Sequence, residues 1–163
     1  MRDIINPRQT ILVSASEKTE VFGKEKEVDN IMAANWHTGL SFEPPMYAIC
    51  LGKNSFTTEL IKKSGNFCVN FMPLSQKDKV FFCGRNSGKL MDKFEKTGLN
   101  KVECEKIDCV RVKEAVAHLE CEVKEEKEAG DHILFIGSIV FSEKHSDEKR
   151  LFNIINDQFT TTQ

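Results

Sequence analysis

The sequence has little of what marks several large classes of protein. No apolar run approaches the roughly 20 residues that a membrane helix needs. Residues 1–7 lack the apolar stretch and cleavage site of a signal peptide. The net charge of −2 provides no basic surface for nucleic acid. We therefore expect a cytoplasmic protein with neither a membrane nor a nucleic acid as its partner.

The six cysteines lack the Cys-x-x-Cys spacing that zinc and iron–sulfur sites commonly use. His, Asp and Glu residues also lack the spacing of a ligand set, so no metal is expected. Most of the cysteines lie in apolar or alternating segments, which favours free, buried thiols, with a disulfide framework as the alternative. Cys83, beside Gly84 and Arg85, is the candidate for a reactive thiol. The absence of Gly-x-Gly-x-x-Gly argues against a Rossmann nicotinamide site.

The residues that are present have the composition of an ordinary globular domain. Of 163 residues, 40% are hydrophobic and 29% charged. Twelve Phe residues, against one Trp and one Tyr, suggest a dry, Phe-packed core. Without repeats or linkers, residues 1–163 are predicted to form a single domain.

Strand patterns dominate the chain. Apolar or alternating runs predict strands over 10–16, 46–51, 66–72, 118–124 and after Gly130. Start and stop signals predict short helices over 53–65, 75–84 and 89–96. Less regular segments predict a return strand or loop over 21–26, a turn over 125–129 and a weak helix over 151–155. Without βαβ periodicity, we predict a mainly β fold with short helices, closed into a Greek-key-like antiparallel barrel.

The segment from Lys53 to Thr57 has the chemistry of a phosphate site. Free N–H groups at a helix N-terminus, together with the helix dipole, attract anions. Asn54 and Ser55 add hydrogen-bonding groups, and Lys89, in a glycine-bracketed loop, offers a second cation. The alternative is an ordinary helix cap.

Residues 30–36 can form one wall of a site for a flat ring. The small side chains of Ala33 and Ala34 would let a ring approach the backbone, whose N–H and C=O groups could pair with a pyrimidine-like edge. The alternative is a buried strand anchored by a Trp. The candidate binding residues in this segment are Asn30, Met32, Ala33, Ala34, Asn35 and Trp36.

A Gly-Asp-His turn precedes the longest apolar strand. Gly130 supplies a turn conformation, and Asp131 can bind nearby backbone amides. His132 then stands at the mouth of the strand, where it could lie over a ligand and titrate near neutrality, so it is the candidate catalytic residue. His37 could line the same site, whereas His118 is expected at the surface.

Five motifs, in this order, resemble the flavin reductase-like, FMN-binding split-barrel family, which includes flavoredoxins and NAD(P)H:flavin oxidoreductases. The resemblance covers roughly residues 8–142. The motifs are Asn-x-Met-x-Ala-x-Trp at 30–36, Ser41-Phe42-x-Pro44-Pro45, Thr57-x-x-Leu60-Ile61-x-x-Ser64-Gly65-x-Phe67-x-Val69-Asn70, Ser87-Gly88-Lys89-x-x-Asp92-Lys93-Phe94 and Gly130-Asp131-His132.

The resemblance implies a split-barrel homodimer that binds FMN noncovalently near the subunit interface. The ring edge would meet the backbone from Met32 to Asn35, the phosphate would meet Lys53 to Thr57 and Lys89, and His132 would lie near the flavin or the incoming nicotinamide. We expect an electron-transfer flavoprotein, an NAD(P)H-dependent flavin or ferric reductase. The alternatives are a flavoredoxin-type carrier between redox partner proteins and a flavin-binding protein without a catalytic role.

Overall fold

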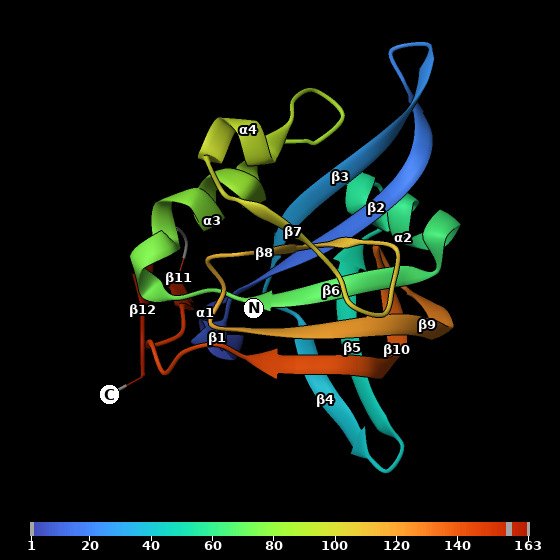
Figure 1. Ribbon diagram of the computed structural model, residues 1–163. Helices are drawn as coiled ribbons and strands as arrows, with labels where there is room; N and C mark the ends of the chain where they lie inside the picture. The colour runs from blue at the N-terminus through green and yellow to red at the C-terminus, as the bar shows by residue number, and fades with distance from the viewer. Residues whose placement is uncertain (1, 156–157, 163) are drawn as a thin grey trace.

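A seven-stranded antiparallel sheet forms the centre of the molecule, in the order β3-β2-β6-β9-β10-β5-β4 (Figure 1). The structure is a computed structural model and describes residues 2–155 and 158–162. Along the chain, the strands of this sheet are β2 (Ile11–Val21), β3 (Lys24–Ala34), β4 (His37–Phe42), β5 (Pro45–Gly52), β6 (Asn66–Phe71), β9 (Ala117–Ala129) and β10 (His132–Lys144). The mainly β fold predicted from the sequence is confirmed.

The connection between β3 and β4 shows that this sheet curls. These two strands are opposite edges of the sheet, yet only Asn35 and Trp36 separate them in the chain. Three Cα–Cα steps span at most about 11 Å, so the two edges must approach each other. The sheet therefore curves into a barrel, and the link between its edges lies at one barrel end (Figure 1).

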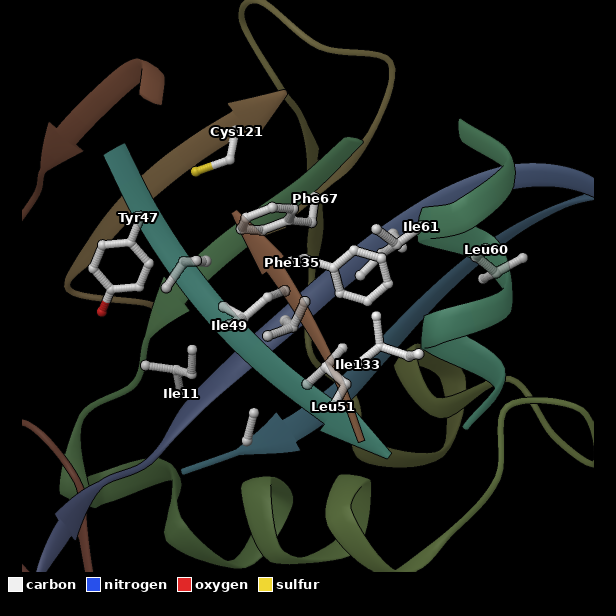
Figure 2. Close-up of a cluster of buried hydrophobic side chains, with 14 of the residues drawn as sticks. Ile11, Tyr47, Ile49, Leu51, Leu60, Ile61, Phe67, Cys121, Ile133 and Phe135 are labelled. Carbon is white, nitrogen blue, oxygen red and sulfur yellow. The ribbon is translucent and has the colours of Figure 1, made fainter. Parts of the chain in front are cut away.

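Apolar side chains from the strands fill the barrel (Figure 2). Helix α2 (Phe56–Ser64) adds Leu60 and Ile61, which are buried against the strands. The helix begins after the N-cap Ser55 and ends at Gly65, whose φ of 71° is left-handed, as the start and stop signals predict.

A second apolar layer covers the outer faces of β2 and β3, through residues such as Leu12 and Ile31. No helix among the described residues is both long and apolar enough to cross a membrane. The elements that follow β6 are η1 (Leu74–Gln76), α3 (Lys77–Arg85), α4 (Lys93–Thr97), β7 (Lys101–Glu103) and β8 (Val110–Val112).

The predicted weak helix over 151–155 is wrong. This segment contains strand β11 (Phe152–Ile155), which pairs with β1 (Arg8–Gln9) and β12 (Gln158–Thr160) in a small separate sheet beside helix α1 (Arg2–Ile5). The partner β1 lies more than 140 positions away in sequence, so local periodicity could not reveal the pairing. Residues 156–157 of the tail, and Met1 and Gln163 of the predicted 1–163 domain, lie outside the described residues.

Other local predictions also need correction. Residues 125–129 are the end of β9, and the turn is only Gly130 and Asp131, because β9 and β10 pair up to Ala129 and His132. Residues 75–78, Ser-Gln-Lys-Asp, predict a helix start like a capping box. Helix α3 does not begin that way, because the side chain of its N-cap, Gln76, makes no capping bond and the 3-10 turn η1 leads into the helix.

Candidate functional site

A cavity of about 550 Å³ lies beside the link between β3 and β4. The end of β3 and the link form one wall, α3 forms a second, and the β9–β10 turn with His132 contributes a third. Residues near both chain ends, including Asn6 and Phe159, complete it. Ligand pockets commonly have volumes of about 300–1,000 Å³, so this main cavity is large enough for a cofactor.

The predicted ring wall lines the main cavity. Met32, Ala33, Ala34, Asn35 and Trp36 all contribute to it. Small residues matter here because α3 packs closely against β3: a Cβ added at Gly84 would lie 3.1 Å from Cβ of Ala33. Small side chains on both elements thus allow α3 to lie close to the backbone of β3.

His132 also lines the main cavity, next to Trp36 of the link. Gly130 has the left-handed φ of 62° that the tight turn requires, and His132 then pairs with Gly52 of β5. The rings of His132 and Trp36 lie 4.5 Å apart, centroid to centroid. Nδ1 of His132 is 2.6 Å from Oδ1 of Asp131, and this hydrogen bond lowers the pKa of the Asp131 carboxyl. Trp36 and His132 therefore form an aromatic pair at the cavity wall.

The predicted phosphate residues at the start of α2 do not line the main cavity. Ser55 caps the helix by accepting from the Thr58 amide at 3.1 Å, and Asn54 is exposed. The Lys53 ammonium is 2.7 Å from Glu128 and the Lys89 ammonium is 2.7 Å from Glu59, and both pairs are partly exposed. Ser55 therefore has the geometry of an ordinary helix cap, the alternative to a phosphate site.

Thr57, in the first turn of α2, forms a buried polar pair with Asn30 of β3. Nδ2 of Asn30 donates to Oγ1 of Thr57 at 2.8 Å, and both residues are buried. The loop before α4 closes on this pair, because a Cβ at Gly88 would lie only 2.0 Å from Oδ1 of Asn30. Strand β3, helix α2 and the Gly88 loop therefore meet at Asn30.

Lys93 is a candidate that the sequence analysis missed. Its buried ammonium donates to the carbonyl oxygens of Ile31 and Cys83, both at 2.8 Å. Burial lowers the pKa of Lys93, and no carboxylate among the described residues pairs with it. Both carbonyls adjoin residues of the cavity wall. The motif Asp92-Lys93-Phe94 contained the signal, but sequence cannot tell which of Lys89 and Lys93 is buried.

Thr10 is a second missed residue of the cavity wall. Its side chain is 3% exposed, and within the described part of the chain its hydroxyl has no hydrogen-bond partner. A buried hydroxyl without a partner is costly. A ligand in the main cavity with a polar edge near Thr10 would remove that cost.

Two other histidines differ from their predicted settings. His37 lines a neighbouring hollow of about 280 Å³, which shares Asn35 with the main cavity. Its Nε2 donates to the Gln9 carbonyl at 3.0 Å, so Nδ1 accepts from the Tyr47 hydroxyl at 2.6 Å. His118 is buried rather than at the surface: its Nε2 donates to the carbonyl of Val112 in β8 at 2.8 Å, and its Nδ1 lies 2.7 Å from Nε2 of His145.

Comparison with known proteins identifies the family of the chain. The model of the flavin reductase like domain matches residues 1–162. The chain belongs to the flavin reductase-like family. An FMN-binding protein from Thermus thermophilus superposes with a TM-score of 0.82 at 25% identity, over 96% of this chain and 87% of that one.

Two further relatives represent different activities within the family. A flavoredoxin from Methanosarcina acetivorans superposes with a TM-score of 0.81 at 26% identity, over 98% of this chain and 87% of that one. An NADH-dependent FAD reductase from Streptomyces globisporus is 29% identical over 110 residues, which are 67% of this chain and 59% of that protein. The split-barrel fold expected from the sequence is thereby confirmed.

Proposed function

We propose that this flavin reductase-like protein binds FMN in the main cavity and acts as an oxidoreductase, a flavin or ferric reductase that takes electrons from NAD(P)H. The observation that carries the proposal is the cavity of about 550 Å³ lined by Met32 to Trp36 and His132, within a fold shared with an FMN-binding protein. Residues 1–163 would act as a single domain.

The wall residues fit a flavin ring. Ala33 and Ala34 leave the backbone of β3 open to a flat ring, and the hydroxyl of Thr10 supplies an unused polar group. When bound, FMN would supply the transfer of hydride and electrons, while the protein binds and orients it. Trp36 and His132 would border the ring and leave access for a donor or acceptor.

The phosphate would lie on the outer side of the point where β3, α2 and the segment before α4 converge, because the Gly88 loop closes on Asn30 itself. Asn30 and Thr57 offer polar groups there, and the Lys93 ammonium is bonded to Ile31, the residue after Asn30. An ammonium buried without a carboxylate is costly unless an anion neutralises it. A phosphate would provide that charge, and Lys53 to Ser55 and Lys89 would add positive and polar groups at the outer side.

Lys93→Met is expected to weaken FMN binding about tenfold or more, because a hydrogen bond to a charged group contributes roughly 1.5–3 kcal/mol. Titration of FMN fluorescence measures the affinity, and a thermal melt checks the fold. Lys89→Met is the matched variant, since this ammonium is exposed and already paired with Glu59 and should change affinity less than about threefold. Unchanged affinity in both variants would remove the proposed phosphate site.

Anaerobic reduction tests the activity. The FMN-loaded protein should bleach at the flavin absorbance bands within seconds of adding NADH or NADPH. Bleaching only with a reduced protein donor would instead support an electron carrier, the second candidate, which the match to a flavoredoxin favours. A purified protein that shows no flavin bands and takes up no added FMN would contradict both.

We also propose a homodimer in the cytoplasm. The β4–β5 hairpin projects from the barrel (Figure 1) and carries Phe42, 99% exposed, and Leu40, 48% exposed. A second copy would cover these side chains. Sedimentation should give a dimeric mass that Phe42→Ser reduces, whereas Phe22→Ser, at the tip of the β2–β3 hairpin, should not. The cytoplasmic location is supported by six free cysteines.

A further inference from the structure

A group of thiols lies outside the main cavity, on the hairpin formed by β7 and β8. Cys104 directly follows β7, and Cys109 directly precedes β8. Both pack against Cys68 of β6 and Ile107. Cys68 and Cys109 are buried, whereas Cys104 is half-buried. Its position makes Cys104 the member of the group that solvent can reach.

The hairpin register places Cys104 directly opposite Cys109. Val102 pairs with Arg111 and Glu103 with Val110, so the next pair outward is Cys104 with Cys109. The Cys104 amide donates to the Cys109 carbonyl at 2.9 Å. The Cys109 amide donates instead to the Ile107 carbonyl at 2.9 Å, so one ladder bond joins the two cysteines. Residues that face each other in an antiparallel ladder have Cα atoms about 4.5–5.5 Å apart and both side chains on one face, and a hydrogen bond links the two thiols here. Disulfides bridge Cα atoms about 4.4–6.8 Å apart, a range that includes the spacing expected for facing residues of a hairpin.

We propose that Cys104 and Cys109 are a thiol-oxidation site, at which the two side chains form a reversible intramolecular disulfide by exchange with a low-molecular-weight disulfide such as oxidised glutathione. In the first step, Cys104 loses its proton to solvent and its thiolate attacks one sulfur of the glutathione disulfide. A Cys104–glutathione disulfide forms as the original S–S bond breaks, and the released glutathione thiolate takes up a proton. In the second step, Cys109 loses its proton and attacks the Cys104 sulfur, which releases the second glutathione. Two electrons thus pass from the two cysteines to the glutathione pair.

The surroundings of the pair favour a disulfide over a metal site. Among the described residues, no group of His, Cys, Asp or Glu side chains has a metal-binding arrangement. A hydrogen bond with Cys109 lowers the pKa of Cys104, but a bond with Cys68 and burial outweigh it, so this pKa is raised. A hydrogen bond with Cys104 and burial raise the pKa of Cys109 as well. Exchange should therefore be slow near neutrality and accelerate as the pH rises toward 9.

The test counts and maps the thiols of the full-length protein. After equilibration with excess oxidised glutathione and quenching with a maleimide, denatured protein should show four free thiols in place of six. Trypsin cleaves after Lys106, so the disulfide would join peptides 102–106 and 107–111, which dithiothreitol should separate. Closing this six-residue loop should raise the Tm by roughly 5 °C.

Serine variants supply the controls. Cys104→Ser and Cys109→Ser should each abolish the linked peptides, whereas Cys50→Ser, at a half-buried cysteine of β5, should keep them. Six thiols remaining at pH 9 would overturn the proposal. So would a link from peptide 102–106 to peptide 64–77, which contains Cys68, or a lasting glutathione adduct on Cys104 with Cys109 still free.

Discussion

Glu120→Gln is expected to lower the free energy of unfolding by about 3 kcal/mol. The Glu120 side chain is fully buried and accepts hydrogen bonds from the backbone amides of Glu105 and Lys106, both at 2.8 Å. It also lies 3.8 Å from the buried guanidinium of Arg111. A glutamine would turn one acceptor into a donor that faces an amide and would leave less negative charge beside Arg111.

Urea unfolding followed by circular dichroism measures this loss. Glu122→Gln is the matched control, because Glu122 lies on the same strand but its side chain is 45% exposed and pairs with Lys124 at the surface, so its loss should stay below about 0.5 kcal/mol. Equal stability of Glu120→Gln and the wild type would show that the carboxylate is not what holds the 105–106 loop.

Lowering the pH from 7 to 4 is expected to remove about 3 kcal/mol of stability through His118 alone. Burial lowers the pKa of His118 from 6.5 to about 4, with Arg111 and His145 as further positive neighbours. The unfolded chain therefore takes up the proton near pH 6.5, while the folded protein resists it down to about pH 4. The contribution of neutral His118 to the free energy of unfolding is therefore fully present above about pH 7 and is lost as the pH decreases from about 6.5 to about 4.

A variant isolates this contribution from other titrating groups. His118→Gln keeps a donor for the Val112 carbonyl but cannot be protonated, so its stability should fall much less between pH 7 and 4. Burial lowers the pKa of His37 as well, and that group contributes in both proteins. Urea midpoints at pH 7, 5 and 4 for both proteins give the difference, and parallel pH dependences would contradict the assignment to His118.

Local sequence signals predicted the elements whose conformation depends on nearby residues. Ser55 and Gly65 mark the two ends of α2, Gly130 marks the turn before His132, and the small pair Ala33 and Ala34 marks an open cavity wall. Cap bonds, left-handed turns and side-chain volume are properties of a few consecutive residues, so a sequence is enough to recognise them.

Long-range packing decided the remaining features. Whether Lys89 or Lys93 is buried depends on how α4 packs on β3, and His118 is buried where its ring bonds the carbonyl of Val112 in β8. Strand β11 exists because β1, at the other end of the chain, supplies its partner. Burial and strand pairing are set by residues far apart in sequence, so local patterns could indicate the wall of the main cavity, while only the folded chain shows which charged groups and which thiols are buried.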